Sequence, residues 1–190
     1  MKIITIIVTH NRLKELKNCL FHINKQRKKP NKILVIDNNS NDGTSEFLKL
    51  NNIDYIYSSH NTGSAGGWNM GIEYAIKNHF DLIWLMDDDG FPHHESLRHL
   101  YNSIQEKNIV CLSSLVVDSK ENSRLAIPLP ILNKNNLPVI FKLKRKIYLK
   151  NDNDIVNNKF YKFANFFNGT LIKLRAIKEI EKINKDFFLY

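Results

Sequence analysis

Short apolar runs alternate with amphipathic stretches over residues 1–117, and this alternation constrains the fold more than any other feature. The first run, Ile3–Val8, is β-branched and bounded by polar residues, which is typical of a strand buried on both faces. We expect strands at 3–8, 32–36, 53–57, 82–86 and 109–117. We expect helices at 13–23, 44–50, 70–76 and 97–104. Strands that alternate with helices form right-handed crossovers, so the pattern predicts an α/β fold with a mostly parallel central sheet flanked by helices.

The composition of the 190 residues suits a globular domain with a hydrophobic core. Apolar residues make up 43% of the chain and charged residues 25%, which are ordinary values. The formal net charge is +9, and basic residues are densest at 25–32 and 142–150. Such a charge attracts polyanions, although basic runs are usually solvated faces. Nucleic-acid binding is the alternative that the charge raises, but no recognised motif accompanies it, so we expect no nucleic-acid partner.

Cysteine usage and the apolar pattern indicate the compartment. Cys19 and Cys111 lie in apolar surroundings without partners at metal-ligand spacing, which is typical of free thiols in a reducing compartment. No signal peptide opens the chain, and no apolar stretch approaches the ~20 residues that span a bilayer. We therefore expect a cytoplasmic protein, with the basic segment 142–150 as a place for peripheral contact with the inner face of an anionic membrane.

The pattern weakens after residue 117. Three prolines interrupt any long element in this region, namely Pro128, Pro130 and Pro138. Basic and apolar residues alternate at 141–149, which predicts an exposed strand or hairpin. We expect a further strand at 170–174 and a helix at 176–183.

Three consecutive aspartates, Asp87, Asp88 and Asp89, directly follow a predicted buried strand. Ligands bind at the carboxyl ends of strands in open α/β sheets, and adjacent carboxylates repel one another unless a cation lies among them. In an extended segment Asp87 and Asp89 point the same way and Asp88 the other, so these two could share Mg²⁺ or Mn²⁺ with phosphate oxygens. A helix cap accounts for one aspartate rather than three. His93 and His94 are alternative ligands, although surface histidines beside a helix start are commoner.

Polar clusters also follow other predicted strands, at 9–12 and 37–40, and a glycine-rich segment at 61–67 precedes a helix. Arg12 could approach phosphate, and Asp37 could accept a hydrogen bond from a base or a ribose. A glycine turn lets the backbone approach a ligand, and the helix N-terminus favours anionic oxygens. Each cluster alone is compatible with turn chemistry and helix capping, but all of them are expected at one edge of the sheet.

Taken in order, these segments resemble the motifs of the inverting family-2 glycosyltransferases. Ile6–Arg12 resembles the family opening V-T-Y-N-R, with His10 in place of the usual tyrosine. Val35–Thr44 matches the segment V-D-N-x-S-x-D-G-T. Asn61–Gly71 is similar to N-x-G-x-A-G-G-x-N-x-G, the form typical of the rhamnosyl- and galactofuranosyl-transferase branch. Met86–Pro92 resembles the D-x-D metal motif of the same branch.

This resemblance implies a Rossmann-like A-type glycosyltransferase fold in a single domain over 1–190. A nucleotide-sugar-binding half would occupy 1–117, and the start of an incomplete acceptor-side half 118–190. The implied reaction is metal-dependent, inverting transfer of a sugar from UDP or dTDP to a saccharide or lipid-linked acceptor, in bacterial surface polysaccharide synthesis. The resemblance assigns the nucleotide sugar to Thr9, Asn11, Arg12, Asp37, Asn39, Asn61, Gly66, Gly67, Asp87 and Asp88, and Mg²⁺ or Mn²⁺ to Asp87 and Asp89.

The family's catalytic base has no match in the chain. It follows segments like Asn168–Ile172 and Phe187–Tyr190, in a motif that usually contains D-D or E-D, whereas Asp186 lies upstream of the aromatic run. The base is therefore expected beyond Tyr190. Two alternatives stay open: a catalytically impaired nucleotide-sugar-binding fragment or subunit, and a sugar nucleotidylyltransferase. The second would need a glycine-rich loop with a basic residue at the first strand end, and Thr9–Arg12 contains no glycine.

Overall fold

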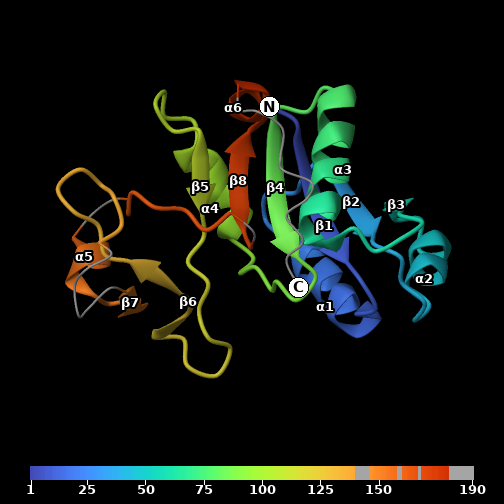
Figure 1. The fold of residues 1–190 in the computed structure, drawn as a ribbon, viewed down its shortest axis with the longest axis horizontal. Coiled ribbons are helices and arrows are strands. Elements are labelled where there is room, and N and C mark those ends of the chain that lie inside the picture. Colours follow the sequence, from blue (N-terminus) through green and yellow to red (C-terminus); the bar gives the residue numbers. More distant parts are fainter. Residues whose placement is uncertain (140–145, 158–159, 167, 180–190) are drawn as a thin grey trace.

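A six-stranded sheet forms the centre of the molecule, with the strand order β3-β2-β1-β4-β8-β5 (Figure 1). The computed structural model describes residues 1–139, 146–157, 160–166 and 168–179. The strands are β1 (Ile3–Thr9), β2 (Lys32–Asp37), β3 (Asp54–Tyr57), β4 (Leu82–Asp87), β5 (Cys111–Ser113) and β8 (Thr170–Lys173). Strands β3, β2, β1 and β4 pair in parallel, and β8 pairs antiparallel with β4 and β5. The mostly parallel sheet predicted from the alternation is confirmed.

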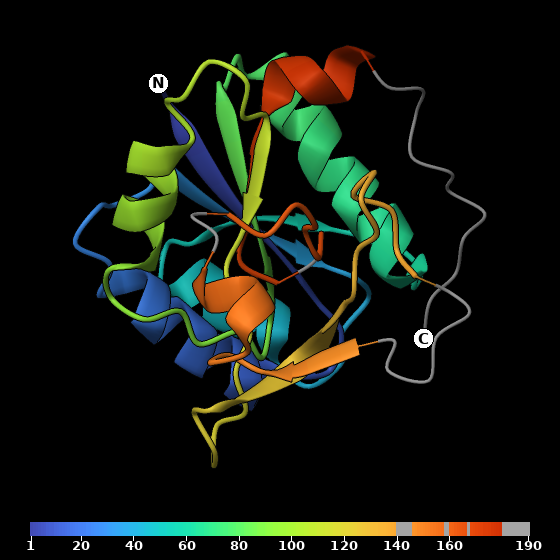
Figure 2. The same cartoon turned by 90° about the vertical axis from the view of Figure 1, so that its left-hand side faces the viewer.

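Helices cover both faces of this sheet, with α1 and α4 on one side and α3 on the other (Figure 2). The helices are α1 (Leu13–Asn24), α2 (Thr44–Leu50), α3 (Gly63–Lys77), α4 (Ser96–Ser103) and α6 (Leu174–Glu179). Side chains along a strand alternate between faces, so Ile3 and Ile7 of β1 join the layer with α1 and α4, while Ile4 and Ile6 join the layer with α3. Burial on both faces explains why the strand is apolar without alternation.

The glycine segment differs from its prediction. We expected the glycines of the segment 61–67 to form a turn before a helix at 70–76, whereas α3 begins at Gly63 and includes these glycines. The physical reason is close packing of this helix on β1. A Cβ on Gly67 would lie 2.5 Å from Val8 Cγ1, and a Cβ on Gly71 would lie 2.4 Å from Ile6 Cγ2. The glycines therefore allow the helix backbone to approach the strand.

The described residues between 118 and 166 lie outside the central sheet. They contain β6 (Arg124–Pro130), β7 (Lys146–Leu149) and the short helix α5 (Asn153–Val156). Strands β6 and β7 pair antiparallel around Leu125, Leu129 and Ile147, which form a small apolar cluster. The chain then re-enters the sheet as β8.

Several elements predicted after residue 108 differ in length or position from those in the structure. The strand expected at 109–117 is shorter, because only Cys111–Ser113 pairs with β8, while Val117 bridges to Leu125. Of the hairpin expected at 141–149, the described part is β7, and 140–145 lie outside the described residues. The predicted helix at 176–183 begins earlier, at Leu174, and 180–190 also lie outside the described residues. None of the helices in the described part of the chain has the length and apolar character needed to cross a membrane.

Candidate functional site

The polar clusters predicted after three strands meet at one edge of the sheet. Strand β1 lies between β2 and β4, and the register pairs Thr9 with Asp37 and Val8 with Asp87. The carboxyl ends of these parallel strands therefore lie side by side. The N-terminal part of α3 lies at the same edge, because Gly67 packs against Val8.

The aspartates form a turn rather than an extended segment. Strand β4 ends at Asp87, and the backbone N–H of Gly90 donates to the carbonyl of Asp87 at 2.9 Å. The expected alternation, with Asp88 pointing away from its neighbours, is therefore wrong. The turn brings the carboxylates of Asp88 and Asp89 to the same guanidinium, that of Arg12. Arg12 Nη1 lies 3.3 Å from Asp88 Oδ1, and Arg12 Nη2 lies 3.0 Å from Asp89 Oδ2.

Burial distinguishes the carboxylates of this acidic turn, Asp87–Asp89. Asp88 is buried and accepts a hydrogen bond from Thr9 Oγ1 at 2.8 Å, whereas the Asp89 side chain is 47% exposed. Burial first, and then the negative charges of Asp89 and Asp88, raise the pKa of Asp87 to about 6. Burial also raises the pKa of Asp88, against the hydrogen bond from Thr9 and the charge of Arg12. Asp88 and Asp89 thus share one guanidinium and Asp87 has no such partner among the described residues, so the turn has an excess of negative charge that suits a further cation.

The donor set fits a divalent metal that is held partly by its substrate. Within the described residues, no group of three or more His, Cys, Asp or Glu side chains is arranged to hold a metal ion. Mg²⁺ commonly takes one or two carboxylates and completes its shell with water and phosphate oxygens. The rings of His93 and His94 lie against each other, tilted by 43° with centroids 4.1 Å apart, and His93 Nδ1 accepts from the backbone N–H of Glu95 at 3.4 Å. They do not join the carboxylates in a metal-binding group of this kind.

Asn38, at the start of the loop after β2, joins that loop to the N-terminus of α3. Its Nδ2 donates to Asn61 Oδ1 at 2.8 Å and to the carbonyl of Gly63 at 3.0 Å. Its Oδ1 accepts from both the backbone N–H and the hydroxyl of Thr62, each at 3.0 Å. The sequence assigned a role to Asn61 but none to Asn38, although the polar run after the strand contains both Asn38 and Asn39. Asn38 is buried and fixes Asn61 and the helix start at the site edge.

The remaining predicted residues of this loop region are engaged in its internal structure. Asp37 is fully buried and accepts from the N–H of Ser40 at 2.9 Å and from the hydroxyl of Ser45. Asn39 has a positive φ of 68° and donates to the carbonyl of Ser59 at 3.1 Å. Asn11 also has a positive φ, 54°, and its Oδ1 accepts from the N–H of Asn41 at 2.7 Å. Their contacts with a nucleotide sugar stay a prediction.

A distant carboxylate caps α1 and leaves Arg12 free for the acidic turn. Arg12 is the N-cap residue and makes no capping bond with its side chain. Asp42 instead accepts from the backbone N–H of Leu13 at 2.9 Å, and it also accepts from the N–H and hydroxyl of Thr44 at the start of α2. Burial opposes the charge on Asp42, but these hydrogen bonds lower its pKa below the ordinary value.

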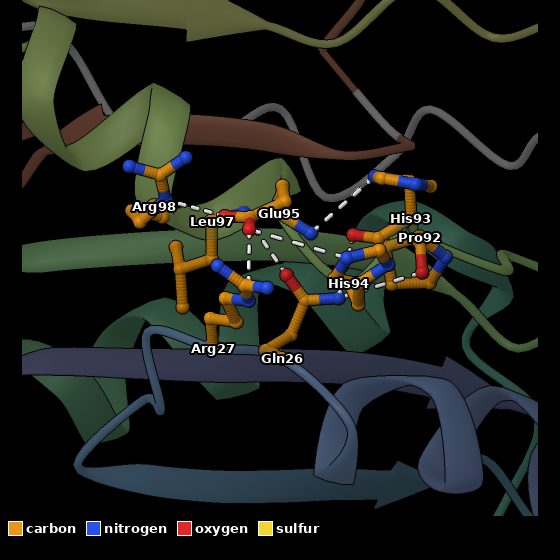
Figure 3. A network of polar contacts seen from close by, with 8 residues as sticks. All are labelled: Gln26, Arg27, Pro92, His93, His94, Glu95, Leu97 and Arg98. Atoms are coloured by element: carbon orange, nitrogen blue, oxygen red, sulfur yellow. Dashed lines mark hydrogen bonds and ion pairs between the residues drawn. The ribbon is translucent and has the colours of Figure 1, made fainter.

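A second network holds the loop that follows the acidic turn (Figure 3). Gln26, buried just after α1, donates through Nε2 to the carbonyl of His93 at 2.9 Å and accepts through Oε1 from the N–H of Leu97 at 3.0 Å. Glu95 pairs with Arg27 at 2.9 Å and with Arg98. The hydrogen bond from Leu97 satisfies one of the free N–H groups at the start of α4. The position of the loop between the acidic turn and α4 is therefore set by α1.

Comparison with known proteins gives a consistent result for the sequence. The family described as Glycosyl transferase family 2 matches residues 4–167. The galactofuranosyltransferase GlfT1 of Mycolicibacterium smegmatis is 32% identical over 127 residues, which cover 65% of this chain and 42% of the relative. The chain thus spans less than half the length of this relative.

Solved structures show the same architecture. Staphylococcus aureus TarS in complex with UDP-GlcNAc superposes with a TM-score of 0.63 at 16% identity, covering 94% of this chain and 47% of the other. GalNAc-T7 with UDP, GalNAc and Mn²⁺ superposes with a TM-score of 0.68 at 13% identity, covering 100% of this chain and 38% of the other. At these identities the likeness concerns the fold, and it confirms the predicted Rossmann-like A-type architecture.

Proposed function

The chain belongs to glycosyl transferase family 2, and from this we propose that it binds a nucleotide-diphosphate sugar at the acidic turn for transfer of the sugar to an acceptor hydroxyl. One observation carries the proposal: three carboxylates follow one another at the end of β4, and the single guanidinium of Arg12 pairs with two of them, Asp88 and Asp89. The acidic turn therefore has an excess of negative charge, which a bound cation would balance. The diphosphate of an activated sugar brings the oxygens that would complete the shell of a divalent metal.

The residues take separate roles in this proposal. Asp87 and Asp89 would hold Mg²⁺ or Mn²⁺, which would stabilise the negative charge of the departing diphosphate. Asp88 and Thr9 fix the guanidinium of Arg12 beside the turn, where it would balance the remaining charge. The N-terminus of α3, positioned by Asn38, offers backbone N–H groups to anionic oxygens.

The nucleotide is proposed to be UDP, with dTDP as the alternative. The galactofuranosyltransferase GlfT1 is named for its sugar, and the TarS and GalNAc-T7 structures contain UDP or a UDP sugar. These names support a uridine donor and a hexose such as galactofuranose. The sugar is proposed to be moved with inversion to a saccharide or lipid-linked acceptor in surface polysaccharide synthesis. Contact with an anionic membrane and a cytoplasmic location belong to the same proposal.

Calorimetric titration with UDP tests the metal site. The wild-type protein should bind UDP in the presence of Mn²⁺ and lose most of this affinity in excess chelator. Asp89→Asn removes an exposed carboxylate without disturbing the core and should weaken Mn²⁺-dependent binding about tenfold or more, or about 1.4 kcal/mol. Asp54→Asn is the matched control, because Asp54 pairs with Lys32 at the other end of the sheet. Equal affinity in the Asp89 variant and the control would contradict the proposal.

A second candidate is a donor-binding subunit that transfers sugar only with another polypeptide. In this candidate the catalytic base would come from the other polypeptide. Release of UDP from UDP-galactofuranose, measured with a synthetic lipid-linked acceptor, separates the two. Acceptor-dependent release by the chain alone supports a transferase, whereas metal-dependent binding without release supports the subunit.

A further inference from the structure

A basic hollow lies at the end of the sheet opposite the acidic turn. It has a volume of about 510 Å³ and lies between the start of β4, the end of α4, the end of β8 and the start of α6. Figure 1 shows α6 beside the N-terminus, at the end of the sheet away from the arrowhead of β4. Since β4 has six residues, the two places are separated by roughly 20 Å at about 3.3 Å per residue. One diphosphate cannot occupy both.

Four cationic side chains from three segments line this basic hollow. They are Lys107 after α4, Lys173 at the end of β8, and Arg175 and Lys178 in α6. Among the described residues, none of the four forms an ion pair. The hollow is also lined by one carboxylate, Asp81, which accepts from the backbone N–H of Lys2 at 2.6 Å. The lining therefore has an excess of positive charge.

Lys173 is the least exposed of the four and the one whose environment most favours an anion. Only 8% of the residue is exposed, and its Nζ donates to the carbonyl of Glu106 at 3.3 Å. Burial lowers the pKa of Lys173, and the positive charge of Arg175 lowers it further. An ammonium group has three donors, so the bond to Glu106 leaves donors for a ligand. An anion in the hollow would relieve both the repulsion and the loss of hydration.

We propose that this hollow binds a phosphate group, held by buried Lys173 together with exposed Lys107, Arg175 and Lys178. Lysine and arginine recognise phosphate through charge-assisted hydrogen bonds, and several converging cations make a site rather than a diffuse positive face. The same chemistry is offered by a soluble phosphate and by the headgroup of an anionic phospholipid. This site is independent of the acidic turn and needs no metal.

Titration with inorganic phosphate in excess chelator tests the site apart from the donor site. Backbone amide resonances of Lys173 and Arg175 should shift with saturation, while those of Asp88 and Asp89 should not. The double variant Arg175→Gln/Lys178→Gln should weaken phosphate binding about tenfold or more. Lys14→Gln/Lys49→Gln removes the same net charge from exposed positions in α1 and α2 and should bind phosphate as the wild type does.

Sedimentation with vesicles identifies the source of the phosphate. Vesicles of phosphatidylglycerol and phosphatidylcholine are compared with vesicles of phosphatidylcholine alone, using the same two double variants at fixed ionic strength. Loss of vesicle binding confined to Arg175→Gln/Lys178→Gln supports a lipid headgroup, and loss of phosphate binding alone supports a soluble ligand. If neither probe binds, or if both double variants weaken binding equally, the proposal is overturned.

Discussion

Individual residues at this sheet edge act through partners that lie far away in the chain. Arg12 precedes α1, yet its guanidinium contacts Asp88 and Asp89 and not the helix that it begins. Asp42 caps that helix in its place. Two glycines of α3 also depend on distant residues. The side chains of Val8 and Ile6 in β1 occupy the positions that a Cβ on Gly67 or Gly71 would need. The chemistry of the site thus depends on residues whose roles follow from contacts with distant segments and not from their neighbours in the sequence.

Gly71→Ala tests whether the close packing of α3 on β1 requires glycine at this position. The added Cβ would lie 2.4 Å from Ile6 Cγ2, so the helix or the strand must shift. Overpacking of this kind costs about 1–3 kcal/mol, against a gain of about 1 kcal/mol in helix propensity. We expect a lower free energy of unfolding in urea. Lys77→Ala, at the exposed end of the same helix, is the control, and an equally stable Gly71 variant would show that α3 does not depend on this contact.

At the scale of elements, α1 organises the loop after the acidic turn. Gln26 follows the end of α1 and bonds to the loop residue His93 and to Leu97, the second residue of α4. The N-cap residue of α4, Glu95, makes no capping bond with its side chain and pairs with Arg27 and Arg98. Two helices on the same face of the sheet are therefore joined through one buried amide. The join also restrains the segment that follows Asp89.

Gln26→Leu should destabilise the protein by about 2 kcal/mol or more, because buried backbone groups that lose a partner cost about 1–3 kcal/mol each. Leu97 is fully buried, so its backbone N–H cannot form a hydrogen bond with water in place of the one to Gln26. Thermal unfolding followed by circular dichroism measures the loss. The matched control is Gln105→Leu, since Gln105 is exposed and its side chain donates to the carbonyl of Tyr101 at 2.8 Å, on the surface of the protein. A similar small effect in both variants would mean that the network in Figure 3 contributes little.

At the scale of the whole molecule, β8 joins the last part of the chain to the first. Its residues 170–173 lie between β4 and β5 and run antiparallel to both. The described residues between 118 and 166 lie outside this sheet and contain a small apolar cluster of their own. The division into halves at 117 and 118 stays a prediction, but the central sheet itself draws on both sides of that boundary.

Leu171→Ala tests the contribution of β8 to the sheet. Leu171 is fully buried in the apolar layer beneath α1 and α4, and truncation of such a side chain costs about 2–5 kcal/mol. We expect a single, cooperative unfolding transition at lower denaturant concentration. Leu115→Ala removes the same atoms from a residue that is 44% exposed and should change stability by less than about 0.5 kcal/mol. Two separate transitions in the Leu171 variant would contradict the role of β8 as a common strand.

The sequence by itself determined the order of strands and helices in the first part and the edge of the sheet at which the polar clusters meet. The period of the apolar residues and the polar runs after the strands are local properties, and they predicted β1 to β4 and the place of the three aspartates after β4. Because β2, β1 and β4 were expected to be parallel, the clusters at their carboxyl ends were expected to lie side by side. The pairing of Thr9 with Asp37 and of Val8 with Asp87 confirms this.

Only the tertiary structure decided how these groups face one another. The sharing of Arg12 by Asp88 and Asp89, the capping of α4 by Gln26 and the place of β8 each join residues about 70 or more positions apart. The basic hollow likewise collects Lys107 with three residues from β8 and α6. Contacts between distant segments depend on the packing of the whole sheet, and no period or motif within one segment encodes them.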